Sequence, residues 1–161
     1  MKIRVGLGFD VHQLELGKPL VLGGVLIPAE KGAVGHSDAD VLIHAICDAL
    51  LGAASLRDIG FHYSNKDPRW RGMASTYFLE DVVRMISEKG WAIENVDCTL
   101  TLEEPKINPH IPAMKKVLAP LMKVHEDDVS IKATTSETLG YVGRKEGVNA
   151  WAVALITKNI I

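Results

Sequence analysis

One stretch near the start of the chain decides the fold: Ile3-Arg-Val-Gly-Leu-Gly-Phe-Asp10-Val-His12. Apolar side chains occupy every second position, and this period of two predicts a β-strand with one apolar face and one open face. Gly6 and Gly8 stand on the open face, where a missing side chain indicates close approach of another backbone. Asp10 and His12 are two residues apart, so their side chains share that face.

A second polar stretch, Gly35-His-Ser-Asp-Ala-Asp40-Val-Leu-Ile-His44, leads into an apolar pattern with helical spacing that continues to about Ser55. Ser37 can cap this helix, with Asp40 three residues later as a weaker capping-box partner. His44 then lies inside the helix, on an element rigid enough to hold a ligand in place.

The rest of the chain divides by the same periodicities. They predict a hairpin over Leu20–Pro28 around Gly23-Gly24, loops over Ala29–Gly35 and Arg57–Gly72, helices over Ser75–Lys89 and Asn108–Lys123, and strands over Val96–Glu103, Val129–Thr134 and Val148–Thr157. This order favours one α+β domain over residues 1–161, with a single four-stranded mixed sheet, helices on one face and a small β-hairpin.

Composition narrows the class of protein. The 161 residues suffice for one domain, and an apolar content of 47% is normal for a globular chain. A net charge of −2 gives no indication of binding to nucleic acid or to an anionic membrane. Cys47 and Cys98 have no CxxC partner and are expected to be buried free thiols. We expect a cytoplasmic protein of bacterial type, with a processed plastid form as the alternative.

Asp10, His12 and His44 form the first candidate metal site. Three nitrogen and oxygen ligands leave a tetrahedral ion one open position, which is typical of a catalytic site. A rival ligand set is open at this point, because Asp40 and His44 are four residues apart and share one helix face.

His36 is a poor candidate for the same ion as His44. Eight helical residues separate the two along about 12 Å, too far for ligands of one metal. At the start of the helix, where anions are favoured, His36 and Ser37 could instead donate hydrogen bonds to a phosphate. The alternative is that His36 is simply a solvated loop residue.

The second cluster of interest is Lys132-Ala-Thr-Thr-Ser-Glu137-Thr-Leu-Gly-Tyr-Val-Gly-Arg144. Its hydroxyl groups and exposed backbone N–H groups are suitable phosphate donors. Glu137 offers a hard oxygen ligand for a hydrated magnesium ion. The alternative is a Ser/Thr turn that caps a short helix. Lys106 and Arg144 are candidate phosphate or interface cations, with an ordinary surface role as the alternative.

These motifs together, in this order and spacing, closely resemble the 2-C-methyl-D-erythritol 2,4-cyclodiphosphate synthase family over essentially the whole chain. The stretches that carry the resemblance are Gly8-Phe-Asp10-Val-His12, Gly35-His-Ser-Asp-Ala-Asp-Val-Leu-Ile-His44, Asp58-Ile-Gly60, Pro105-Lys106, Ala133-Thr-Thr-Ser-Glu137 and Gly143-Arg144.

The resemblance implies a phosphorus–oxygen lyase of non-mevalonate (MEP) isoprenoid precursor biosynthesis. The 2-phosphate of 4-CDP-2-C-methyl-D-erythritol 2-phosphate would attack the β-phosphate, CMP would leave, and the 2,4-cyclodiphosphate would form. It also implies a homotrimer with active sites between adjacent subunits, and no nucleic acid or membrane partner. Because the substrate carries its own nucleophile, catalysis would consist of alignment and charge neutralisation.

The resemblance also assigns roles to residues. Asp10, His12 and His44 match the ligands of Zn²⁺ or another divalent transition metal, which leaves Asp40 a capping or supporting role. Glu137 matches a carboxylate associated with Mg²⁺ or Mn²⁺. The two matched transition-state stabilisers are His36 and Thr135. The matched substrate-site positions are Asp10, Val11, His12, His36, Ser37, Asp58, Ile59, Gly60, Tyr63, Ser64, Asn65, Lys66, Asp67, Leu102, Glu103, Glu104, Pro105, Lys106, Ile107, Asn108, Thr134, Thr135, Ser136, Glu137, Tyr141 and Arg144.

Some residues depart from the family pattern. Tyr63-Ser-Asn-Lys-Asp67 stands where the family commonly has Phe-Pro-Asp-Thr-Asp, so the contacts to the erythritol hydroxyls are expected to differ. Glu103 and Glu104 are acidic for a loop beside a diphosphate, and we expect their side chains to point outward. Tyr141 replaces a frequent Phe near the trimer axis, which would make a cavity there more polar.

Two rival functions remain open on the sequence. A zinc-dependent phosphohydrolase would use the same three ligands to activate water. A trimeric binding module without turnover could hold a diphosphate with the same sheet and the region of Arg144.

Overall fold

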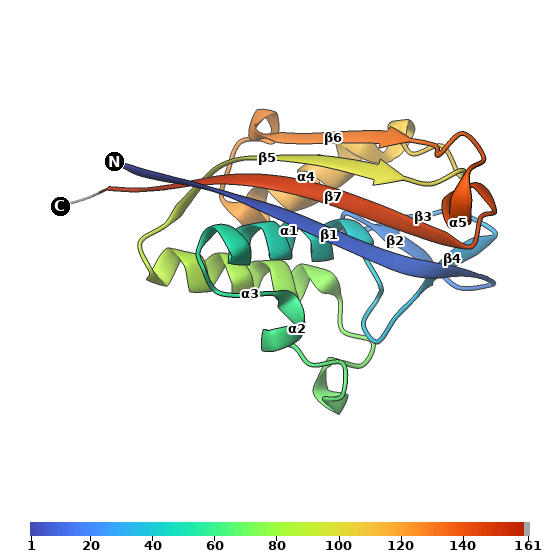
Figure 1. The fold of residues 1–161 in the computed structure, drawn as a ribbon, viewed down its shortest axis with the longest axis horizontal. Coiled ribbons are helices and arrows are strands. Elements are labelled where there is room, and N and C mark those ends of the chain that lie inside the picture. Colours follow the sequence, from blue (N-terminus) through green and yellow to red (C-terminus); the bar gives the residue numbers. More distant parts are fainter. Residues whose placement is uncertain (160–161) are drawn as a thin grey trace.

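The computed structural model describes residues 1–159, and its central feature is one five-stranded sheet in the order β4-β1-β7-β5-β6 (Figure 1). β5 and β6 are parallel and the other neighbours are antiparallel, so the sheet is mixed, as predicted. A separate two-stranded hairpin joins β2 to β3. The strands are β1 (Lys2–Leu16), β2 (Leu20–Leu22), β3 (Val25–Ile27), β4 (Lys31–Val34), β5 (Ala92–Thr101), β6 (Val129–Thr134) and β7 (Gly147–Lys158).

The long helices cover one face of this sheet (Figure 1). α1 packs on β1 and β7, α3 packs on α1, and α4 packs on α3 and β6. The described part of the chain holds no helix with the length and apolarity that a membrane crossing needs. The helices are α1 (Val41–Ala53), α2 (Ile59–His62), α3 (Ser75–Glu88), α4 (Ile111–Met122) and α5 (Gly140–Gly143), and the 3₁₀ turns are η1 (Pro68–Trp70), η2 (Asn108–His110) and η3 (Glu126–Asp128).

The prediction of four strands in the sheet was wrong, because β4 forms where a loop was expected. β4 has only four residues and no alternating pattern of its own. It forms by pairing with Gln13–Leu16, the part of β1 that extends beyond the predicted strand. Pairing between distant segments thus decided the structure where local pattern gave no signal.

Helix starts also differ from the prediction. Asp40, not Ser37, caps α1: its side chain accepts a hydrogen bond from the backbone N–H of Ile43 at 3.1 Å. The predicted helix over Asn108–Lys123 divides into η2 and α4, with α4 beginning at Ile111. The segment predicted as irregular, 57–72, contains the short helices α2 and η1.

The open face of β1 packs directly on α1, as the glycines indicated. A Cβ atom at Gly8 would lie 1.9 Å from the carbonyl oxygen of Ala45, and one at Gly6 would lie 1.9 Å from that of Ala49. Only a missing side chain permits this distance. The close approach brings the first turn of α1 over the end of β1 that carries Asp10 and His12.

The apolar face of β1 is the one that no element of the described chain covers. Phe9 packs on Trp151 of β7 with ring centroids 4.4 Å apart, but both rings remain largely exposed. A contiguous apolar surface on a single chain usually marks an interaction site. We call this surface the outer sheet face; its exposed apolar residues are Ile3, Val5, Leu7, Phe9 and Val11 of β1 and Trp151 and Val153 of β7.

Both cysteines are buried and free, as predicted. Cys47 lies in α1 and Cys98 in β5. Burial raises the pKa of both thiols, that of Cys98 to about 12, so neither is a reactive thiolate at neutral pH.

Candidate metal centre and substrate pocket

Asp10, His12 and His44 meet where the end of β1 faces α1. Oδ2 of Asp10 lies 2.9 Å from Nε2 of His12 and 3.1 Å from Nδ1 of His44. The two imidazole nitrogens are 3.2 Å apart. The three side chains each offer one ligand atom, and these atoms all lie within 4.8 Å of one another. This is a possible metal-binding triad with two nitrogen donors and one oxygen donor.

The second nitrogen of each imidazole is occupied, and this fixes which nitrogen can face a metal. Nδ1 of His12 lies 3.0 Å from the carbonyl oxygen of Val34, so it must carry the proton and donate. Nε2 of His44 lies 2.9 Å from Oγ of Ser75, whose own proton is donated to Asp38. When neutral, His12 therefore presents the lone pair of Nε2, and His44 that of Nδ1, toward Asp10; when protonated, the same nitrogens donate to its carboxylate. Such outer partners typically orient metal-binding histidines.

Asp10 and His12 each shift the pKa of the other toward its charged form. Burial alone would raise the pKa of Asp10, but hydrogen bonds with His12 and His44 and their charges outweigh it and lower the pKa from 3.8 to about 2. Burial lowers the pKa of His12, but the hydrogen bond and the charge of Asp10 outweigh it and raise the value above normal. The carboxylate is thus ionised at neutral pH and ready to bind a cation.

Asp40 does not join the triad, so the rival set with His44 does not form. Its two carboxylate oxygens accept backbone N–H groups from Gly23 at 3.0 Å, Gly24 at 2.7 Å and Ile43 at 3.1 Å. The side chain is fully buried and ties the β2–β3 turn to the start of α1. Burial raises its pKa to about 6, although these backbone hydrogen bonds act in the opposite direction.

A cavity of about 420 Å³ opens beside the triad. Trp70 and Phe78 were not anticipated as part of a site. Trp70 is the one aromatic residue of the polar sequence 64–72, a signal that could have been used, whereas Phe78 has the spacing of a core position. The cavity is lined by the triad with Gly35, His36, Ser37, Ile59, Gly60, Tyr63, Asn65, Trp70 and Phe78.

His36 and Ser37 lie in this cavity, but not at the helix N-terminus on which their phosphate role was argued. The cap of α1 is Asp40, so a carboxylate already occupies that position. Nε2 of His36 lies 3.0 Å from the carbonyl oxygen of Asp67. Oγ of Ser37 accepts from the backbone N–H of Ala39 at 3.3 Å. Both residues thus line the cavity beside the triad through these contacts and not through the N-terminus of α1.

The other predicted positions of the first half do not line this cavity. The side chain of Asp58 caps α2, accepting from the N–H of Phe61 at 2.9 Å. Asp67 pairs with Arg69 at 2.5 Å. Ser64 and Lys66 are exposed on the same loop. Val11 belongs to the outer sheet face, because the strand period places it opposite Asp10 and His12.

Most of the positions predicted in the second half line a separate cavity of about 240 Å³. No residue within 1–159 lines both this cavity and the one beside the triad. Leu102 and Ile107 belong to the core, so neither offers an exposed side chain to a ligand. The second cavity is lined by Leu102, Glu103, Pro105, Lys106, Ile107, Asn108, Ala133, Thr134 and Thr135.

The prediction that Glu103 points outward was wrong. Its Oε1 accepts from the backbone N–H of Ser136 at 2.9 Å, from the hydroxyl of Ser136 at 3.0 Å and from the N–H of Thr138 at 3.4 Å. The carboxylate thus holds the hydroxyl-rich loop after β6. Glu104 is exposed, as expected, and pairs with Lys145 at 2.9 Å.

The remaining predicted residues surround this loop. The hydroxyl of Thr135 donates to Oε1 of the exposed Glu137 at 3.2 Å. The phenol oxygen of Tyr141 accepts from the side-chain amide of Asn149 at 2.7 Å. Arg144 is exposed and pairs with Glu146.

Comparison with known proteins gives consistent similarities. A family model described as the YgbB family matches residues 3–157. The chain is 63% identical over 158 residues to the 2-C-methyl-D-erythritol 2,4-cyclodiphosphate synthase of Cytophaga hutchinsonii, covering 98% of this chain and 99% of that protein. A solved 2C-methyl-D-erythritol-2,4-cyclodiphosphate synthase in its CDP-bound form is 42% identical with a TM-score of 0.88, covering 96% of this chain and all of that one. The bifunctional IspDF of Campylobacter jejuni is 36% identical with a TM-score of 0.94, covering 98% of this chain and 43% of that one.

Proposed function

The chain belongs to the YgbB family, that of the 2-C-methyl-D-erythritol 2,4-cyclodiphosphate synthases, and from this we propose which of its residues bind metals, which bind the substrate and which stabilise the transition state. It has the cyclodiphosphate synthase function, a lyase reaction of the MEP route to isoprenoid precursors. The observation that carries the assignment of residues is the triad of Asp10, His12 and His44 beside an aromatic-walled cavity.

The triad would hold Zn²⁺ or another divalent transition metal through Oδ2 of Asp10, Nε2 of His12 and Nδ1 of His44. The donor set of two nitrogens and one oxygen suits zinc and leaves a fourth position for the substrate. The occupied second nitrogen of each histidine supports this choice of atoms. When bound, the ion would polarise a phosphoryl oxygen as a Lewis acid. Glu137, exposed on the loop after β6, would bind Mg²⁺ or Mn²⁺ through its carboxylate.

The substrate is 4-CDP-2-C-methyl-D-erythritol 2-phosphate in this proposal. An oxygen of its 2-phosphate attacks the β-phosphorus, a new P–O bond closes the ring, and the bond to CMP breaks. The protein supplies no nucleophile, so its task is to fold the substrate into an in-line arrangement and to neutralise charge. His36 and Thr135 stabilise the transition state, and the residues of the 102–108 loop receive the cytidine diphosphate.

The active sites lie between adjacent subunits of a homotrimer. Two observations support this arrangement. The outer sheet face is apolar and uncovered in the described chain, which fits an interface between subunits. The cavity beside the triad and the cavity of the 102–108 loop share no lining residue within 1–159, as expected if two neighbouring chains complete one site.

The reaction run in ¹⁸O-labelled water separates this function from its rivals. Intramolecular attack predicts one CMP released per cyclic diphosphate formed, with no label in either product. A phosphohydrolase would release labelled orthophosphate or a labelled phosphomonoester, and a binding module would release no CMP. Either result would overturn the proposed function.

A further inference from the structure

Tyr63 stands on the wall of the cavity beside the triad, and its hydroxyl reaches outside that wall. The centroid of its ring lies 4.7 Å from that of Phe78 and 5.4 Å from that of Trp70, which it meets nearly at right angles. All three rings line the cavity. The phenol O–H donates to Oδ2 of Asp81, on α3, at 2.5 Å. Asp81, which does not line this cavity, thus holds the ring of Tyr63, which forms part of the cavity wall.

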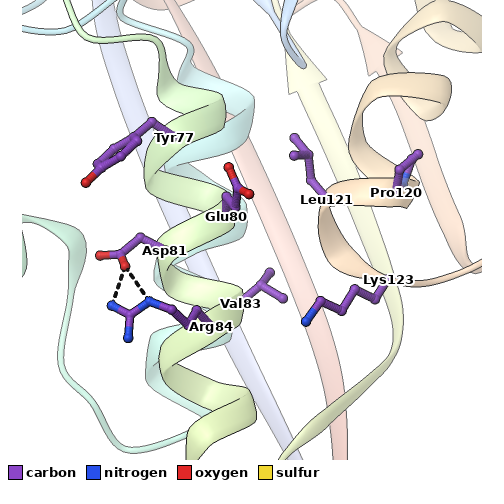
Figure 2. A pocket seen from close by; sticks show the side chains of 8 residues that line it. All are labelled: Tyr77, Glu80, Asp81, Val83, Arg84, Pro120, Leu121 and Lys123. Carbon is purple, nitrogen blue, oxygen red and sulfur yellow. Dashed lines mark hydrogen bonds and ion pairs between the residues drawn. The ribbon is translucent and has the colours of Figure 1, made fainter.

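Asp81 is itself held from the other side. Its Oδ1 accepts from Nε of Arg84 at 3.0 Å, and Figure 2 shows this pair on the side of α3 that points away from α4. Both groups line an open cavity of about 580 Å³, across which lie Leu121 and Lys123. Burial would raise the pKa of Asp81, but the hydrogen bonds from Tyr63 and Arg84 outweigh it and lower the value, so Asp81 is a fixed anion at neutral pH.

The segment that follows Tyr63 needs such an anchor. Ser64 and Asn65 are exposed, and neither restricts the backbone as proline would. Beyond Tyr63, the segment is held by a turn from the N–H of Asp67 to the carbonyl oxygen of Ser64 at 3.0 Å, and by His36 on the carbonyl oxygen of Asp67 at 3.0 Å. A shift of the Tyr63 ring would move the cavity wall and displace this segment.

We propose that Asp81 is a positioning residue for the cyclodiphosphate synthase reaction: by holding the phenol of Tyr63 it fixes the wall against which the methylerythritol phosphate part of the substrate folds. This inference rests on the proposed function. Because the reaction is intramolecular, a small displacement of this wall reduces the fraction of bound substrate that is aligned for attack. The cytidine diphosphate part, received by the 102–108 loop, does not depend on Tyr63.

The test compares Tyr63→Phe, Asp81→Ala and the double variant, with Glu80→Ala as a control on the exposed side of the same turn of α3. Tyr63→Phe keeps the ring and removes only the hydroxyl, so folding is preserved. Each single change is expected to lower kcat/KM for the full substrate about tenfold, as the loss of one charge-assisted hydrogen bond implies. The double variant is expected to lose no more than either single one, because both changes break the same bond.

Two further measurements separate positioning from general damage. The affinity for CDP, which lacks the methylerythritol phosphate, is expected to stay within about twofold of the wild type in every variant. Such a change in affinity is well below that caused by the loss of one hydrogen bond. Asp81→Asn, which keeps an acceptor oxygen for Tyr63, is expected to recover most of the activity. Unchanged kcat/KM in Tyr63→Phe, additive losses, or an equal loss of CDP affinity would overturn the inference. Failure of the proposed function has a different signature, since wild-type protein would then form no cyclic diphosphate.

Discussion

The hydroxyl of Ser75 lies 2.9 Å from Nε2 of His44 and donates its own proton to Asp38. Ser75 is the first residue of α3 and fully buried, whereas Asp38 belongs to the turn before α1. The backbone N–H of Ser75 also donates to Asp38, at 2.9 Å. One carboxylate and one hydroxyl therefore set the tautomer of a candidate metal ligand and join the starts of two helices.

Replacing Ser75 with alanine is expected to weaken zinc binding by about 10- to 100-fold, since outer hydrogen bonds of metal ligands typically contribute this much. Nε2 of His44 would lose its shorter hydrogen bond and keep only the contact with Oγ of Ser37 at 3.3 Å, so the ring would be held less firmly with Nδ1 toward Asp10. Competition with a zinc-selective chelator measures the change. Ser87→Ala is the matched control, because this hydroxyl on the same helix donates only to the carbonyl oxygen of Val83. Equal zinc affinities in the two variants would argue against the role of Ser75.

Gly8 and Gly52 are expected to respond oppositely to replacement by alanine. A Cβ at Gly8 would lie 1.9 Å from the backbone oxygen of Ala45, so α1 must move; we expect a loss of at least about 2 kcal/mol of unfolding free energy. Gly52 is exposed in α1 with nothing within 4 Å of a new Cβ, and its replacement should stabilise by about 0.5–1 kcal/mol. Denaturant unfolding of both variants measures the difference. A Gly8→Ala protein as stable as the wild type would contradict the close packing of β1 on α1.

Much of the fold followed from periodicity in the sequence. The alternation around Gly6 and Gly8 predicted the strand and the close approach of a backbone, and both are present. The same alternation could not say which face of β1 is covered, since an apolar stripe fits a core and an interface equally well. β4 was missed because it is short and its pairing with β1 is non-local.

The site was predictable only where residues carry chemistry of their own. Strand spacing placed Asp10 and His12 on one face, helix periodicity made His44 a candidate, and the family resemblance selected this set; the three lie together. Spacing could not exclude Asp40, because its three backbone hydrogen bonds come from segments that meet only in the folded chain. The supporting groups Ser75 and Asp38 gave no signal, since isolated Ser and Asp residues are usually turn or surface residues.

Asp40 gives the stability of the protein a pH dependence that the sequence alone does not suggest. Its folded pKa of about 6 lies above the unfolded value of 3.8, so the folded state binds the proton more tightly. The stability that this group contributes is fully present below pH 3.8 and is lost as pH rises through about 6. Asp40→Asn should remove this dependence of stability on pH between 3.8 and about 6. The measurement is the difference in melting temperature between wild type and variant across that pH range. A difference that does not change with pH would contradict the raised pKa.

A charge on the outer sheet face is expected to break the proposed homotrimer. Leu7 is 63% exposed on this face, and Leu7→Lys would place an ammonium group in the proposed interface. Leu26→Lys is the matched control: Leu26 is 67% exposed but lies on the hairpin that packs on α4. Light scattering after size exclusion should give a monomer for Leu7→Lys and a trimer for Leu26→Lys. Trimers in both would remove the outer sheet face as the interface.

The central claim is that the triad holds the metal on which turnover depends, and zinc content measured together with CMP release tests it most directly. The comparison uses His44→Ala and, as a matched control, His125→Ala, whose side chain is 77% exposed at the N-terminal cap of η3. If the triad holds the metal, His44→Ala retains the wild-type oligomeric state while losing the bound metal and nearly all CMP release, and His125→Ala keeps both. A His44→Ala protein that still released CMP at the wild-type rate would contradict the claim.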